Sequence, residues 1–203
     1  MSSETSCPNC GAALPDLLAH ARMVNCDFCG SSVVRDDDVV AKAGEAGAML
    51  DAPELVAVGV PVRLGQEGTF TATGHVRYDY GRGHWDEYHG SLDTGGLIWV
   101  SVDEGDIVLQ RPVTDGAPAL RGTPRIGSTL AWGGTDYDCT EVSSAKAVAF
   151  RGQLPEAIVV GESHMFANFS GPRGLILSLE TWEEGRNWFA GVWIDPFQVE
   201  RLL

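Results

Sequence analysis

The sequence predicts a mainly β fold in two parts, and three observations support this prediction. Two Cys-x-x-Cys pairs lie near the start of the 203-residue chain. From Val56 onward, short apolar or alternating runs are separated by Gly, Pro and Asp, which is typical of strands joined by turns. No helical stripe of useful length competes with these runs. The larger, C-terminal part is therefore expected to be an all-β sandwich or a partly open barrel.

The N-terminal part is defined by four cysteines with fifteen residues between the two pairs. They are Cys7, Cys10, Cys26 and Cys29. This spacing is typical of a tetrahedral tetrathiolate zinc site, because each short turn directs two sulfurs at one ion. Gly11 and Gly30 follow the pairs, where a left-handed backbone suits glycine. Four thiolates leave no position for water, so we expect one structural Zn2+ per chain; disulfides and redox thiols are the alternatives.

Three segments follow from this pattern. A zinc ribbon is expected over 1–35, a partly helical linker over 36–54 and an all-β domain over 55–203. Asp36–Asp38 favours the first turn of a helix, whereas Gly44 and Gly47 weaken it. The clearest strand patterns in the β-domain are Val56–Val58, Thr69–Thr73, Leu97–Val102, Ile107–Leu109, Ala147–Phe150, Ala157–Val160 and Leu175–Leu179.

Two short similarities suggest that the β-domain consists of two related halves. Val62–Gly65 is similar to Pro124–Gly127, and Gly96–Trp99 is similar to Gly174–Leu177. Chance similarity among strand-forming residues explains these matches equally well. If the repeat is real, it implies two β-units that share one core.

The charge of the chain restricts its partners. The sequence has 28 acidic and 14 basic residues and a formal net charge of −14. Nucleic acid is not expected as a partner, because binding phosphates requires a basic surface. The excess permits a basic protein, a polycation or a metal, and solubility alone is the alternative reason for it. No apolar run approaches the roughly 20 residues of a transmembrane helix, and no secretory signal is visible. Zinc-bound thiols fit a reducing compartment, so we expect a cytoplasmic protein.

Residues 74–89 hold the densest group of chemically capable side chains, in two alternating runs around Gly81–Gly83. If Tyr80 lies opposite His84, then Arg77 lies opposite Glu87 and His75 opposite His89. This register places Trp85 and Glu87 on one face with Arg77 and Asp79, and Tyr78 on the other with Val76, Tyr80 and Tyr88. The candidate ligand or partner surface is His75, Tyr78, Trp85, Glu87 and His89. A half-buried structural hairpin is the alternative.

The larger part also resembles a bacterial family called domain of unknown function 4178, over about residues 55–200. The resemblance is carried by short motifs. They are Leu64-Gly65, Gly74-x-Val76-x-Tyr78, Trp85-x-Glu87-Tyr88, Trp99-Val100, Asp103-x-Gly105, Tyr137-x-Cys139-x-Glu141 and Gly152–Pro155. It implies an all-β domain that often follows a zinc ribbon, and a link to polyamine or membrane-stress systems. It supplies no catalytic residues.

These observations favour a non-enzymatic accessory or adaptor protein that presents its β-domain to a protein partner. A closed metal site, an acidic surface and the lack of a catalytic constellation support this function. The alternative is a small-molecule binder, for example of a polycation, or an enzyme that uses the 74–89 hairpin. A deep pocket that collects the candidate side chains would support the alternative.

Overall fold

A computed structural model describes residues 5–36, 39–49, 54–183 and 185–202. These residues form fourteen strands and two short 3₁₀ turns, Pro172–Gly174 and Pro196–Gln198, so the prediction of a mainly β protein is confirmed. All pairings between named strands are antiparallel. Within the described part of the chain, no helix is long and apolar enough to cross a lipid bilayer.

The N-terminal part ends in a three-stranded sheet. Its strands are β1 (Met23–Asn25), β2 (Ser31–Asp36) and β3 (Val39–Glu45). Strand β3 replaces the partly helical linker predicted for this stretch, and that prediction is wrong for 39–45. The reason is tertiary: β3 pairs with β2 from Val39 to Glu45, whereas Gly44 weakens a helix. Residues 37–38 and 50–53 of the predicted linker lie outside the described residues.

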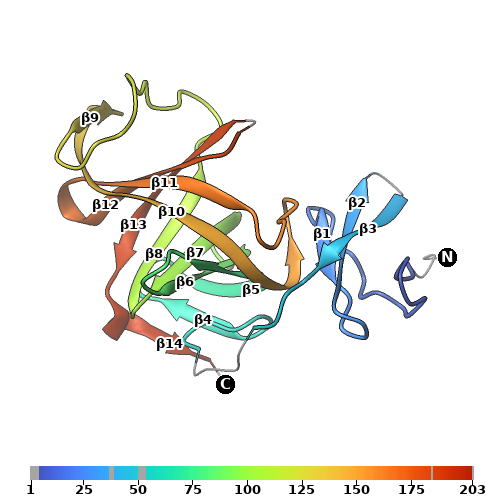
Figure 1. The fold of residues 1–203 in the computed structure, drawn as a ribbon. Helices are drawn as coiled ribbons and strands as arrows, with labels where there is room; N and C mark the ends of the chain where they lie inside the picture. Colours follow the sequence, from blue (N-terminus) through green and yellow to red (C-terminus); the bar gives the residue numbers. More distant parts are fainter. Residues whose placement is uncertain (1–4, 37–38, 50–53, 184, 203) are drawn as a thin grey trace.

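Eight strands of the larger part form a closed ring, visible in the centre and left of Figure 1. Consecutive strands pair in the order β5, β6, β7, β8, β13, β12, β11, β10, and β10 returns to β5 through Lys146–Gly152 and Gly74–Asp79. Of the two expected architectures, the barrel is the one observed, but its ring is closed rather than partly open. The eight strands are β5 (Thr69–Asp79), β6 (His84–Leu92), β7 (Leu97–Asp103), β8 (Asp106–Pro112), β10 (Thr135–Leu154), β11 (Ser163–Ser170), β12 (Leu175–Thr181) and β13 (Arg186–Ile194).

Three short strands flank the ring. They are β4 (Pro61–Leu64), β9 (Thr129–Trp132) and β14 (Val199–Arg201). Strand β4 pairs with β5 and β14, and β9 pairs with the start of β10. Two predicted strands are wrong: Ala157–Val160 is a loop with Ile158 buried, and Val58 makes only an isolated bridge to Ala72.

The two similar segment pairs differ in their structures. Val62–Leu64 lies in β4, whereas Pro124–Gly127 forms a turn before β9. Leu97 and Leu175 both begin ring strands, β7 and β12. Only the second similarity therefore joins segments of the same kind.

Apolar side chains fill one cluster in the ribbon and three clusters in the larger part, of which one lies inside the ring and two outside it. The interior cluster includes Tyr78, Trp85, Trp99, Phe150, Phe166 and Phe189. The second, around Phe70 and Tyr88, lies on the outer face of β5–β8 and includes side chains of β4. The third, around Phe169 and Leu177, lies on the outer face of β10–β13 and includes side chains of β9. Because both faces of the ring strands are covered, apolar residues occupy both positions of their alternation.

The ribbon is joined to the ring edge to edge. Met23 and Val24 of β1 pair with Leu154 and Gln153 at the end of β10, where Figure 1 shows the ribbon beside the ring. The Met23 side chain is 2% exposed and belongs to the interior cluster of the ring. The two parts therefore share both a sheet and a hydrophobic core.

The register of the 74–89 hairpin differs by one residue from the prediction. Asp79 lies opposite His84, Arg77 opposite Asp86 and His75 opposite Tyr88. The turn is longer than expected because the Asp79 carboxylate accepts a hydrogen bond of 2.6 Å from the Gly81 backbone, so the turn begins one residue earlier. The predicted pairs of Arg77 with Glu87 and of His75 with His89 are therefore wrong.

The one-residue difference also changes which side chains share a face. Glu87 and Trp85 lie on the same face as Val76 and Tyr78, inside the ring. Arg77 instead binds Asp86 on the outer face, with Nε and Nη2 donating at 2.7 and 3.0 Å. The expected grouping of Trp85 and Glu87 with Arg77 is therefore a further correction.

Candidate metal centre and acidic pocket

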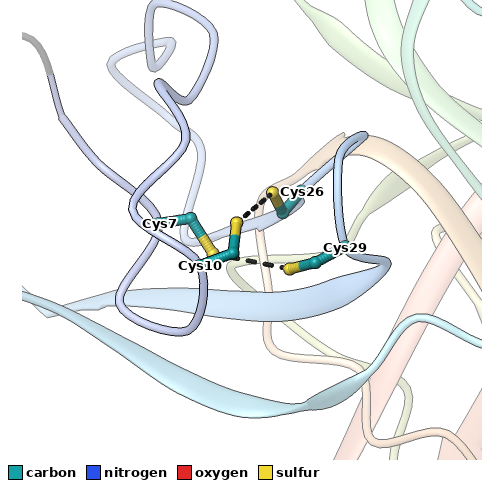
Figure 2. A group of neighbouring side chains, drawn as sticks. All are labelled: Cys7, Cys10, Cys26 and Cys29. Carbon is teal, nitrogen blue, oxygen red and sulfur yellow. Dashed lines mark hydrogen bonds between the residues drawn. The ribbon is translucent and has the colours of Figure 1, made fainter.

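The four predicted cysteine ligands come together in the ribbon. Their sulfurs lie within 4.8 Å of one another, and Figure 2 shows them directed at a common point. Two sulfur–sulfur distances, Cys7 to Cys29 and Cys10 to Cys26, are 3.8 Å. A tetrahedron with metal–sulfur bonds of about 2.3 Å has edges of about 3.8 Å. The cluster is therefore suited to hold one metal ion with four thiolates.

The two cysteine turns have the same backbone geometry. The N–H groups of Gly11 and Gly30 each donate 2.8 Å to the carbonyl of the first cysteine of the pair, Cys7 and Cys26. Both glycines have positive φ, 77° and 70°, as the sequence predicts. A side chain at these positions would be strained in the left-handed region. The glycines therefore shape the turns that direct the sulfurs inward.

Two polar groups favour the thiolate form of Cys29. The Ser31 hydroxyl lies 3.2 Å from its sulfur, and Asn9 Nδ2 donates at 3.6 Å. These contacts, that of Ser31 first, lower the pKa of Cys29 to about 6. A metal ligand must be deprotonated, so the contacts of Ser31 and Asn9 favour metal binding through Cys29.

A second site lies inside the ring, at the end away from the ribbon. It is a cavity of about 110 Å³ lined by residues of seven ring strands. Five carboxylates line it: Glu87, Asp103, Asp106, Glu141 and Glu180. None of the described residues that line it is Lys or Arg. Aromatic side chains of Tyr80, Trp85, Phe166 and Trp193 complete the wall.

Glu87 is a buried carboxylate of this acidic pocket that accepts a hydrogen bond. It is 8% exposed, and Ser101 Oγ donates a hydrogen bond of 3.1 Å to it. Burial raises the pKa of Glu87 to about 7, although hydrogen bonds from Trp85 and Ser101 act in the opposite direction. The carboxyl group therefore changes charge near neutral pH.

Glu180 reaches the pocket from β12. It is 7% exposed, and no hydrogen bond to its carboxylate occurs among the described residues. Burial and the neighbouring charges of Glu87 and Glu156 raise its pKa well above the usual range. Two buried carboxyl groups thus face one pocket with no basic partner in its lining.

Gln110 on β8 has an unused acceptor in the same pocket. Its Nε2 donates 3.4 Å to Ser101 Oγ, but its Oε1 is buried without a hydrogen-bond partner among the described residues. The residue is 4% exposed and lines the cavity. A buried unpaired carbonyl is costly, so this oxygen is available to a donor that enters the pocket.

The three remaining carboxylates of the pocket differ from one another in hydrogen bonding and in exposure. Glu141 accepts a hydrogen bond of 2.9 Å from Asn168, which in turn accepts one of 2.8 Å from Ser178. Asp103 and Asp106 are exposed and lie opposite each other beside the turn between β7 and β8. They form the rim of the pocket. Partial burial of the carboxyl group and the nearby charge of Glu104 raise the pKa of Asp103.

The structure divides the five hairpin residues of the candidate surface among four places. Trp85 and Glu87 line the acidic pocket. Tyr78 and His164 line a separate cavity of about 220 Å³. His75 lies on the outer face, where Nε2 is 2.7 Å from Asp86. His89 contacts Trp99 and His20 of the ribbon, with ring centroids 5.0 and 5.2 Å apart.

The pocket contains residues that the sequence reasoning missed. Glu180, Gln110 and Ser178 lie on strands whose sequences are typical of an apolar core. The available signal was the alternation of Ile176, Ser178 and Glu180 with Leu175, Leu177 and Leu179. Only the closed ring shows that the polar set faces inward.

Fold and site together define a class of protein: a four-cysteine ribbon fused to a closed eight-stranded ring that encloses an acidic pocket. Residues 58–196 match the family described as domain of unknown function (DUF4178), and the chain belongs to this family. Comparisons with curated proteins and with solved structures found no match. The ring, its pocket and the 74–89 hairpin all lie within the matched residues, whereas the four cysteines precede them.

Proposed function

We propose that this chain is a non-enzymatic accessory protein that binds a small cationic ligand inside its ring. One observation carries the proposal: five carboxylates and the unpaired Gln110 oxygen line one cavity that has no basic residue in its wall. Two of these carboxylates, Glu87 and Glu180, are buried. Buried negative charge is costly unless it is paired, and a cation supplies the missing partner.

The aromatic wall supports a cation that is organic. Trp85 and Trp193 present indole rings to the pocket, and a positive group over such a ring is attracted by its quadrupole. Alkyl parts of the ligand would pack against Phe166 and Ile176, which line the same cavity. An amine with an apolar body matches both features.

The polar groups of the pocket support binding rather than covalent catalysis. Its lining contains two serines, Ser101 and Ser178, and no His, Cys or Lys among the described residues. Both hydroxyls are engaged, one with Glu87 and the other with Asn168. A serine nucleophile requires an adjacent general base that orients it, commonly histidine.

We further propose that the ribbon holds structural zinc and that the protein works in the cytoplasm with a protein partner. Four thiolates at tetrahedral spacing support zinc as the bound ion. Thiolates that are not oxidised to disulfides fit a reducing compartment such as the cytoplasm. The partner is supported by Phe28, an aromatic residue 82% exposed between Cys26 and Cys29. Exposed aromatic side chains are enriched at protein interfaces.

The cation-binding proposal is tested by thermal unfolding of the zinc-loaded protein with 1-aminobutane, calcium, magnesium and butanoate. We expect a cation to raise Tm and butanoate to have no effect, because a ligand that binds only the folded state stabilises it. Glu180→Gln should remove this response. Glu104→Gln is the matched control, since Glu104 is exposed near the rim but does not line the pocket. An equal response in both variants would reduce the effect to nonspecific surface attraction.

A further inference from the structure

The carboxylates of the acidic pocket lie at two depths. Glu87 and Glu180 are 8% and 7% exposed, whereas Asp103 and Asp106 are exposed at the rim. Ser101, the hydrogen-bond partner of Glu87, precedes Asp103 by two residues on β7. Two residues of a strand span about 7 Å. The pocket thus offers an inner and an outer negative group, separated by about the length of a short alkyl chain.

Along the inner face of β8, an acceptor at the rim, an apolar residue and a buried acceptor follow one another. Asp106 is exposed at the rim, Val108 is 6% exposed, and Gln110 is buried with its Oε1 unpaired. These three residues alternate along the strand, so they share one face. Trp193 lies opposite Val108 on β13 and lines the same cavity. An apolar section therefore separates two groups that accept hydrogen bonds.

The acceptors are not arranged to bind a metal ion. Among the residues that the structure describes, the only metal-ligating side chains that converge in a group of three or more are the four cysteines. The pocket carboxylates are spread over five strands, β6, β7, β8, β10 and β12. Calcium and magnesium require six or more oxygens around one point. Spread acceptors suit a ligand with charges at separate positions.

On the basis of the cation-binding function proposed above, we propose that the ligand is a linear aliphatic diamine or polyamine. Its inner ammonium group is held by Glu87, Glu180 and Gln110 Oε1. Its methylene groups pack against Val108 and Trp193, and its second ammonium group meets Asp103 and Asp106 at the rim. Each ammonium group of the ligand thus meets hydrogen-bond acceptors of the pocket, and the methylene groups between them meet an apolar wall.

This arrangement makes affinity depend on the second charge. The rim carboxylates are exposed to water, so each one that pairs with an ammonium group changes affinity by at most about fivefold. Two such pairs at the rim together correspond to about a tenfold change in affinity. A monoamine of the same carbon skeleton lacks this contribution.

The test is isothermal titration calorimetry of the zinc-loaded, full-length chain with 1,4-diaminobutane, spermidine and 1-aminobutane. We expect the diamine to bind about tenfold more tightly than the monoamine, and spermidine at least as tightly as the diamine. Because this comparison uses the unaltered protein, it does not depend on the folding of any variant. Magnesium chloride, titrated in parallel, probes the rival ligand class.

Variants locate the two ends of the ligand. The double variant Asp103→Asn and Asp106→Asn should bring the diamine to the affinity of the monoamine and leave the monoamine unchanged. Glu180→Gln should weaken both amines. Glu104→Gln, which removes a charge beside the rim but outside the pocket lining, should change neither. Circular dichroism of each variant verifies its fold.

The possible failures are distinguishable. If no amine and no metal ion binds, the proposed function is wrong and this inference is wrong with it. If both amines bind equally and Glu180→Gln weakens both, cation binding stands and the diamine inference is overturned. If magnesium binds and the amines do not, the site takes a cation of another class, and the inference is again overturned.

Discussion

At the residue scale, the charge of Glu87 depends on groups from several ring strands. Ser101 on β7 donates to it, Gln110 on β8 contacts that serine, and Glu180 on β12 shares the same pocket. Tyr78 on β5 and Glu156 in the loop after β10 are further titratable groups close enough to interact with it. The surrounding groups are neutral or acidic, so the pocket favours the protonated form of Glu87 more than water favours that of an exposed glutamate.

This charge state predicts how stability changes with pH. The pKa of Glu87 is about 7 in the folded chain against an ordinary value of 4.5. Between these values the folded chain holds a proton that the unfolded chain has released, so stability falls as pH rises through this window. We expect the stability of Glu87→Gln, relative to the unaltered protein, to rise by about 2.5 kcal/mol from about pH 5 to about pH 8. Urea unfolding at both pH values measures this difference.

The comparison with the variant is needed because two histidines act in the opposite direction. Burial lowers the pKa of His89 and His164 to about 4, from an ordinary 6.5. The unfolded chain takes up these protons first as pH falls, so the histidine contribution grows as pH rises from about 4 to 6.5. It is the same in both proteins and cancels. A pH-independent difference between the two proteins would contradict the buried state of Glu87.

At the element scale, the turn between β7 and β8 sets the position of the pocket rim. Asp103 and Asp106 pair directly across Glu104 and Gly105, which both have positive φ, 49° and 100°. This is the backbone of a type I′ hairpin turn, for which Asn-Gly is the preferred sequence. Glu104 is one of only two non-glycine residues with positive φ in the described chain.

Replacing Glu104 should therefore stabilise the protein. A left-handed conformation costs an ordinary residue about 1–2 kcal/mol, and asparagine tolerates it better. We expect Glu104→Asn to raise the free energy of unfolding by about 1 kcal/mol, measured with urea. Asp136→Asn is the control, because it removes one exposed charge at a residue with ordinary φ. An equal gain in the control would assign the effect to reduced charge repulsion.

Strand β12 illustrates how far the sequence predicts the fold and the site. Its strand character was predictable from Leu175–Leu179, and the ribbon was predictable from four cysteines at metal-site spacing. The inward direction of Ser178 and Glu180 was not. Periodicity shows that they share a face, but both faces of β12 are covered, since Leu177 packs outside the ring. Which face encloses the pocket depends on ring closure, a contact between distant segments.

One local hydrogen bond and one strand pairing explain the wrong predictions in two other elements. The hairpin register depended on one hydrogen bond, from Gly81 to Asp79, that shifted every pair by one residue. Strand β3 depended on an available edge of β2. Propensity and pattern do not contain this information, because tertiary pairing decides between weak local preferences.

At the scale of the whole molecule, the ribbon contributes to the ring. Met23 fills part of the interior cluster, and Asn25 Oδ1 accepts a hydrogen bond from the Gly152 backbone. Ala46 accepts one of 2.9 Å from Phe150. Folding of so small a unit would depend on the metal ion proposed for its four cysteines. Metal loss should therefore affect residues far from the cysteines.

We expect metal removal to lower the Tm of the ring by several degrees, because β10 loses a paired strand and the interior cluster loses Met23. Tryptophan fluorescence reports the ring alone, since all six tryptophans lie between Trp85 and Trp193. Cys26→Ser should reproduce the shift caused by a chelator, and chelator added to this variant should cause no further change. A ring Tm that ignores both treatments would show that the ribbon is energetically independent.

The edge-to-edge joint also has a consequence for the order in which the chain folds. Strand β1 lies at residues 23–25, but its partner on β10 lies at 153–154, and the ring closes between residues 74–79 and 146–152. Pairings over such separations form slowly, because a long loop must be closed first. During synthesis the cysteines leave the ribosome well before β10 does. We therefore expect the four cysteines to bind their proposed ion early in synthesis. The edge of β1 that pairs with β10 then stays unpaired until the last third of the chain has been made.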